Sequence, residues 1–180
     1  VEIPKPWSRA ISAMDSCGEN CFRARDYDDL VDSPILLGTP AVYEFRVGGT
    51  PHALVNVSEL ARFDGARAAR DLEKIAQAQQ RIWGSFPYDR YLFLNLLTGG
   101  GGGMEHARST VMMADREAGA NAARYRRWLT LSSHELFHAW NVKKLRPRAI
   151  VPGEFEEEPY TRELGIAEGF STYYGALAVH

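Results

Sequence analysis

The chain has 180 residues, which suffice for one ordinary domain or for a domain core and part of a neighbour, but not for several complete domains. Hydrophobic residues make up 45% and charged residues 24%, a balance typical of soluble globular proteins rather than disordered or fibrous chains. The formal net charge of -2 gives no electrostatic reason to expect nucleic acid or an anionic membrane as a partner. The longest apolar run, residues 91–97, has the length of a buried strand, so no membrane span is expected.

The start of the chain lacks both an initiator Met and the pattern of a signal peptide, so we expect a piece of a longer protein. Cys17 and Cys21 have three residues between them. A local disulfide is one interpretation, whereas a metal site would need two more soft ligands nearby, and none is evident. The cysteines therefore leave the cellular compartment open.

The first 40 residues are rich in turn formers. Residues 21–24 and 35–37 are predicted as strand fragments, and residues 26–29 and 32–34 as turns. We interpret residues 1–40 as the end of an N-terminal β-rich domain.

The later elements follow a strands-then-helices order. In chain order we predict a hairpin with strands at 42–47 and 52–57 around Gly48-Gly49-Thr50, a helix of about four turns from Ala68 that stops at Gly84, strands at 91–97 and 109–113, a long helix from about 121 to 141 that ends before Pro147, and a last helix from about 162 to the end. This order favours an α+β fold without regular βαβ alternation.

The strongest chemical signal is an H-E-x-x-H motif at residues 134–138, inside the predicted long helix. Residues four apart on a helix lie about 40° apart around its axis, so His134 and His138 can bind one zinc ion. Glu135 then lies beside the ion, where it can transfer a proton. Two ordinary surface or core histidines are the alternative interpretation.

A catalytic zinc site normally has three protein ligands, so a third is expected downstream. Glu168 is the best placed of the candidates. It lies on a small polar face of the last helix, together with Ser171, Thr172 and Gly175, and such a face would let another helix approach closely. An ordinary buried or paired glutamate is the alternative. The remaining candidates lie mostly in a loop that we expect to be solvated: Glu154, Glu156, Glu157, Glu158 and Glu163.

Five consecutive glycines, residues 99–103, precede Met104, Glu105 and His106. A P-loop is excluded, because it requires Gly-Lys-Ser/Thr at its end. An exposed flexible linker is one interpretation. We favour the other, in which the glycines let the backbone pass close to a bound peptide.

Three segments together resemble the glycyl aminopeptidase family of bacterial zinc metallopeptidases: Gly-Gly-Gly-Met-Glu-His at 101–106, Ser-Ser-His-Glu-Leu-Phe-His-Ala-Trp-Asn at 132–141 and Ala-Glu-Gly-Phe at 167–170. Residues 25–34 and 141–147 add to the resemblance, which covers most of the chain from about residue 20. The family belongs to the gluzincins, whose members share a thermolysin-like catalytic domain.

The resemblance implies that residues 41–180 are the metal-binding, N-terminal half of such a domain, with a mixed or antiparallel sheet and long helices. The C-terminal half would lie outside this chain, together with the Tyr or His that steadies the oxyanion. Tyr173 and Tyr174 are expected to pack in the core instead. The rest of the parent chain, which in this family often includes a PDZ domain, is an expected partner.

For the metal, the resemblance implies a single zinc ion bound by His134, His138 and Glu168, with Glu135 as general base. The interval between His138 and Glu168 is longer than is usual in the larger related aminopeptidases. Residues 146–163 could supply the extra length as an inserted loop. Asn141 and Thr172 would lie near the right faces to orient the histidines.

For the substrate, the resemblance implies that Glu105 binds the free α-amino group of a peptide, with Gly103, Met104 and His106 beside it. His106 replaces the Asn of the larger related enzymes. The implied activity is removal of small N-terminal residues such as Gly or Ala by metal-activated water. A catalytically inactive zinc-binding or peptide-binding domain, and an endopeptidase of the same fold, stay open as alternatives.

Overall fold

The computed structural model describes residues 1–57, 63–148 and 160–179. Its elements in chain order are β1 (Arg9–Ser12), β2 (Asp15–Gly18), β3 (Cys21–Arg23), α1 (Tyr27–Val31), β4 (Ile35–Gly38), β5 (Ala41–Val47), β6 (Thr50–Val57), α2 (Gly65–Trp83), β7 (Tyr91–Leu97), β8 (Gly102–Glu105), β9 (Ser109–Ala114), α3 (Ala122–Phe137) and α4 (Leu164–Leu177). This mixture confirms the predicted α+β class. Within the described part of the chain, no helix is both long and apolar enough to cross a membrane.

The central sheet has five strands in the order β5-β6-β7-β9-β8 and is mixed, as expected. β5 and β6 form the predicted antiparallel hairpin, whereas β6 pairs with β7, and β7 with β9, in parallel. Parallel neighbours need a crossover connection, and α2 provides it between β6 and β7. The sheet therefore contains one βαβ unit, although the sequence shows no regular alternation of this kind.

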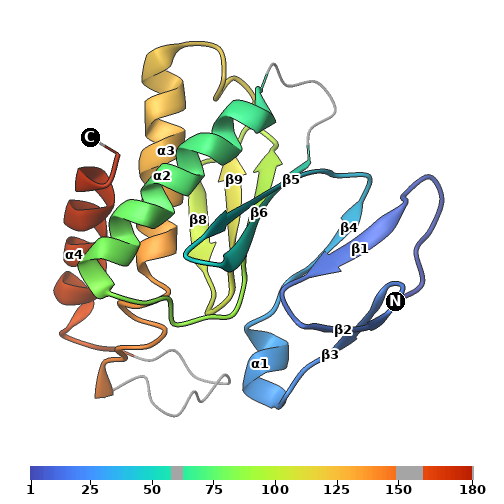
Figure 1. Ribbon diagram of the computed structural model, residues 1–180, viewed down its shortest axis with the longest axis horizontal. Coiled ribbons are helices and arrows are strands. Elements are labelled where there is room, and N and C mark those ends of the chain that lie inside the picture. Colours follow the sequence, from blue (N-terminus) through green and yellow to red (C-terminus); the bar gives the residue numbers. More distant parts are fainter. Residues whose placement is uncertain (58–62, 149–159, 180) are drawn as a thin grey trace.

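Each face of the sheet is covered by a different part of the chain. Residues on one side of the strands, such as Leu54 and Phe93, pack with Leu72 of α2 and Leu136 of α3. Their strand neighbours point to the opposite face, where Val55 and Leu94 pack against Leu36 of β4. The N-terminal strands and α1 accordingly lie on the side of the sheet away from α2 and α3 (Figure 1).

Local signals explain the ends of α2. Asp64 accepts a hydrogen bond from the backbone N–H of Arg67 at 2.9 Å, which satisfies one free donor of the first turn. Gly84 ends the helix with φ of 81°, a conformation that glycine adopts without steric cost. The predicted stop is confirmed, but the helix starts at Gly65 and has 19 residues, more than the four turns expected.

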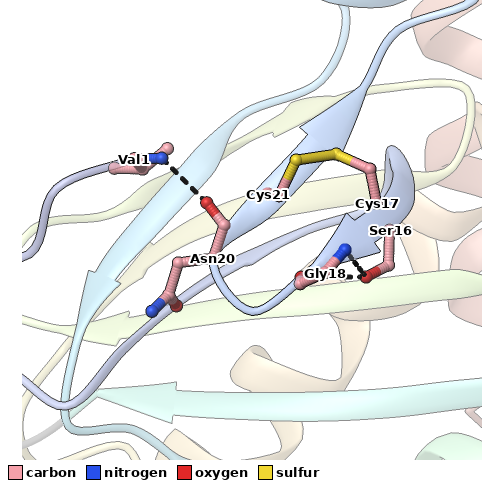
Figure 2. The surroundings of a disulfide bond; sticks show 6 residues. All are labelled: Val1, Ser16, Cys17, Gly18, Asn20 and Cys21. Atoms are coloured by element: carbon pink, nitrogen blue, oxygen red, sulfur yellow. Dashed lines mark hydrogen bonds between the residues drawn. A yellow bond between two sulfur atoms is a disulfide. The ribbon is translucent and has the colours of Figure 1, made fainter.

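The N-terminal region departs from prediction at residues 26–29. The structure has the short helix α1 there instead of a turn, because Asp26 caps the N–H of Asp29 at 2.8 Å. Cys17 and Cys21 form a disulfide bond, which resolves the alternatives left open by their spacing (Figure 2). Asn20 accepts a hydrogen bond from the N-terminal amine, so the β2–β3 hairpin is also tied to the start of the chain.

The sequence pattern did not indicate β8. This strand pairs with β9 in antiparallel register, Gly103 opposite Met112 and Glu105 opposite Thr110. Ladder hydrogen bonds join backbone groups and need no side chain, so glycines can pair at the edge of a sheet although they show no hydrophobic alternation. As a result, the glycine run ends in an ordered strand that carries Glu105.

Candidate metal centre

Buried polar contacts anchor α3, the helix that carries the H-E-x-x-H motif. Asn121 caps its first turn. Gln79 of α2 donates to the Ser133 carbonyl at 2.7 Å and to its hydroxyl at 2.9 Å, in a fully buried contact. Trp128 donates from Nε1 to Asn95 of β7 at 3.0 Å. The contacts of Gln79 and Trp128 therefore fix α3 against both α2 and the sheet.

The predicted helix to residue 141 is too long, since α3 ends at Phe137 with His138 as its C-cap residue. The backbone carbonyl of Asn141 accepts a hydrogen bond from Nδ1 of His138 at 2.9 Å. The N–H of Leu145, which would bond that carbonyl in a continuing helix, donates instead to the carbonyl of Trp140 at 2.7 Å. Just after Phe137, the N–H groups of Ala139 and Trp140 donate three residues back, to Leu136 and Phe137, so the regular helix ends there although single helical turns continue to Lys144.

Three atoms that could bind a metal ion lie close together at the C-terminal end of α3. Nε2 of His134 and Nε2 of His138 lie 2.9 Å apart, and Oε2 of Glu168 lies 3.2 Å from the first and 3.7 Å from the second. Ligands of a tetrahedral zinc ion at about 2.0–2.1 Å from the metal lie about 3.3–3.4 Å from one another. Both the nitrogen and oxygen donor set and its spacing therefore fit one zinc ion.

Close helix packing brings Glu168 to the histidines. A Cβ atom at Gly175 of α4 would lie 3.0 Å from both Cα and N of His134. Ala167 and Ser171 are buried on the same side of α4. The small face predicted from the sequence therefore does let another helix approach, and that helix is α3.

Hydrogen bonds set the protonation of the ring nitrogens. A carbonyl oxygen can only accept, so Nδ1 of His138 carries the proton and Nε2 is free to bind a metal. Ser171 lies 3.2 Å from the same Nδ1, and Thr172 lies 3.4 Å from Nδ1 of His134. Burial and the neighbouring His138 lower the pKa of His134, which favours the neutral, metal-binding form. Asn141 and Thr172 were anticipated in these positions, but Ser171 was not.

Glu135 lies next to this group without being part of it. Glu135 is 4% exposed. Burial, together with the charges of Glu105 and Glu168, raises the pKa of Glu135 to about 8. Its carboxylate, the carboxylate of Glu105 and a ring nitrogen of His138 lie within 4.8 Å of one another. A buried carboxyl group with a pKa near neutrality can both accept and donate a proton.

The glycine-rich segment supplies the wall behind Glu135. A Cβ atom at Gly103 would overlap with the carboxylate of Glu135, so β8 reaches this position only because residue 103 has no side chain. Glu105 ends β8 close to Glu135, whereas the Met104 side chain is 61% exposed. His106 is buried in the turn after β8, where its Nδ1 lies 3.4 Å from Asp32.

The other residues considered in the sequence have different surroundings. Glu163 is the exposed N-cap residue of α4, and the acidic candidates 154 and 156–158 lie outside the described residues. Tyr174 stacks on Phe137, in agreement with core packing, but the prediction is wrong for Tyr173, which is 60% exposed.

Sequence reasoning missed Asp32 altogether. It contacts the turn after Glu105 from the N-terminal region. Its only sequence signal was its place in the 25–34 segment that contributes to the family resemblance, because nothing local indicates a partner some 75 residues away.

Comparison with known proteins relates the chain to aminopeptidases. Residues 127–180 match the model of the M61 glycyl aminopeptidase family. The structure is similar to the crystal structure of an aminopeptidase N family protein from Idiomarina loihiensis, with a TM-score of 0.90 and 34% sequence identity over 97% of this chain. The chain spans about a third of that protein, 32% of its length. No curated protein matches the sequence. The family match and the structural similarity confirm the resemblance seen in the sequence, and the chain is a relative of the M61 glycyl aminopeptidases.

Proposed function

We propose that this chain is the metal-binding part of a zinc-dependent aminopeptidase with a thermolysin-like, gluzincin catalytic domain. One observation carries the proposal: Nε2 of His134, Nε2 of His138 and Oε2 of Glu168 converge within 3.7 Å, beside the buried carboxyl group of Glu135. This arrangement supplies three ligands and a separate base, which a purely structural zinc site does not need.

The protein groups divide the work of peptide hydrolysis. His134, His138 and Glu168 would hold a zinc ion, which would lower the pKa of a bound water toward about 7 and polarise the scissile carbonyl. Glu135 accepts the proton of the attacking water and passes it to the leaving nitrogen as the C–N bond breaks and the C–O bond forms. His138, oriented by the Asn141 carbonyl and by Ser171, would present Nε2 to the ion.

Charge balance supports recognition of a free N-terminus. Glu105, Glu135 and Glu168 bring three carboxyl groups close to two imidazoles, and burial, followed by the charges of Glu105 and Glu168, raises the pKa of Glu135. One divalent ion and one ammonium group would neutralise the three carboxylates. Glu105 would therefore bind the α-amino group of the peptide by charge-assisted hydrogen bonds, which makes the enzyme an aminopeptidase rather than an endopeptidase.

The substrate class follows from the family resemblance, which favours peptides with a small N-terminal residue such as Gly or Ala. The domain arrangement is part of the same proposal, with residues 1–40 ending a β-rich domain and residues 41–180 forming half of the catalytic domain. Ile166, Phe170 and Leu177 of α4 are each more than half exposed on one apolar side of the helix. The remainder of the parent chain would cover this side.

The test uses the full-length protein that contains this chain. Zinc content is measured first, and then hydrolysis of alanyl and glycyl peptides is compared with hydrolysis of the same peptides acetylated at the N-terminus. We expect one zinc ion per chain, cleavage of the free peptides, and its loss in Glu135→Gln with zinc retained. Equal cleavage of acetylated peptides would favour an endopeptidase. Zinc without turnover would favour the non-catalytic alternative.

A further inference from the structure

The turn between β8 and β9 decides where Glu105 lies. Glu105 is the last residue of β8, and the next backbone N–H, that of His106, donates to the Ser109 carbonyl at 2.9 Å. Thr110 closes the hairpin from the other side by donating to the Met104 carbonyl at 3.1 Å. A shift of this tight turn would therefore carry the Glu105 carboxylate with it.

Asp32, at the C-cap of α1, holds this turn from outside the sheet. Oδ2 accepts a hydrogen bond from the N–H of Ala107 at 2.7 Å, and Oδ1 lies 3.4 Å from Nδ1 of His106. Burial opposes ionisation, but hydrogen bonds from His106 and the charge of Lys143 outweigh it and lower the pKa of Asp32. The carboxylate is thus charged at neutral pH and binds the turn at two consecutive residues.

The same carboxylate also reaches the segment after α3. Oδ1 of Asp32 accepts a hydrogen bond from Nζ of Lys143 at 2.7 Å. Lys143 lies two residues after Asn141, whose carbonyl orients His138. Asp32 therefore connects the strand that carries Glu105 with the segment that follows the two motif histidines.

A second contact acts one residue further along the turn. Arg108 donates to both carboxylate oxygens of Asp29, at 2.8 and 3.1 Å, and both side chains are at most 8% exposed. Asp29 lies one turn before Asp32 on α1. The carboxylates of Asp29 and Asp32 therefore bind residues 106–108 together, so the position of the turn does not depend on a single hydrogen bond.

We infer that Asp32 is a positioning residue for recognition of the peptide α-amino group. It holds Glu105 at the distance from the proposed metal site that binding of a peptide N-terminus requires. It touches no reacting atom and acts through His106 and Ala107. The inference rests on the proposed aminopeptidase function. It gives the N-terminal region a role in substrate binding that the motifs of the catalytic domain do not reveal.

The test compares Asp32→Ala and Asp32→Asn with Asp28→Asn in the full-length protein. Asp28 is an exposed carboxylate on the same helix and serves as the matched control. For alanyl and glycyl peptides we expect Asp32→Ala to raise KM at least tenfold while kcat changes less than threefold and zinc content stays at the wild-type level. Asp32→Asn retains an acceptor for the Ala107 N–H, so its KM should lie between those of the wild type and Asp32→Ala. Asp28→Asn should match the wild type.

Hydrogen exchange separates this inference from the proposed function. In Asp32→Ala, amides of residues 104–108 should exchange at least tenfold faster, while those of β9 keep their protection. If the wild-type protein cleaves no peptide, the proposed function fails, and exchange alone still decides whether Asp32 holds the turn. A wild-type KM in Asp32→Ala, unchanged exchange at residues 104–108, or a loss of zinc in parallel with activity would overturn the inference.

Discussion

Replacement of Gly103 by Ala tests how closely strand β8 packs against Glu135, the proposed general base. The added Cβ atom would lie 2.6 Å from Cγ of Glu135 and would overlap with its carboxylate. Carbon atoms in contact lie about 3.5–4.0 Å apart, so the Glu135 side chain has to move by about 1 Å. The backbone at residue 103 has no left-handed conformation, so alanine itself causes no strain there.

A displacement of this size should reduce kcat by about 10²-fold, because catalysis depends steeply on the position of the base. Overpacking should lower the free energy of unfolding by about 1–3 kcal/mol, which leaves the protein folded. Zinc content should not change, since the three atoms nearest to the added Cβ atom all belong to Glu135, which lies outside the proposed ligand set. The assay is peptide hydrolysis with bound zinc measured in the same samples.

Gly101→Ala is the matched control, because a Cβ atom at that position meets no atom within 4 Å. It should retain wild-type kcat. If Gly103→Ala also kept wild-type kcat, the fit between β8 and Glu135 would not matter for catalysis, and the role given to Glu135 would be refuted as well.

Three further predictions concern the metal, the helix pair and acid stability. Glu168→Ala should weaken zinc binding at least tenfold by equilibrium dialysis and leave the fold intact by circular dichroism; unchanged affinity would remove Glu168 from the ligand set. Gly175→Ala should push α4 away from α3, because its Cβ atom would lie 3.0 Å from His134, and should lower both zinc affinity and thermal stability; equal stability and affinity in the variant would refute this close contact. Hydrogen bonds from Arg25 and the charge of Arg108 outweigh burial and lower the pKa of Asp29 to about 2 from 3.8. This contribution to stability is fully present above pH 3.8 and is lost as the pH falls toward 2, so Asp29→Asn should show a weaker decline over that interval in urea unfolding.

Signals local in the sequence predicted most of the fold. The glycine that ends α2 and the asparagine that caps α3 act through their own backbone and nearest neighbours, so their meaning can be read without the rest of the chain. The strand at Tyr91–Leu97 was predicted from its apolar run and has those bounds in the structure. The spacing of the two motif histidines also brought them together as expected, since helix geometry fixes it.

Features that depend on distant partners could not be predicted. The Asn141 carbonyl reaches His138 only through the turns that follow α3, and β8 exists because β9 pairs with its backbone. Asp32 is bound to residues 74 and 75 positions away, and no pattern in the acidic stretch distinguishes it from its exposed neighbour Asp28. Such contacts arise only after the sheet and helices have assembled.

The candidate site likewise combines local features, which the sequence predicts, with long-range contacts, which it does not. His134 and His138 lie on one helix and were fixed by spacing, whereas Glu168 needed the small face of α4 to pack on α3 before it could reach them. Glu105 required the unpredicted strand β8 to bring it beside Glu135. Residue types thus indicated which side chains to consider for the candidate site, but the assembly of the site depended on tertiary packing.

The most direct test of the account is X-ray anomalous scattering at the zinc edge from crystals of the full-length protein, purified without added metal or chelator. The account predicts one anomalous peak about 2.0–2.2 Å from Nε2 of His134, Nε2 of His138 and a carboxylate oxygen of Glu168. A peak bound by other residues, or no peak at this position, would contradict it.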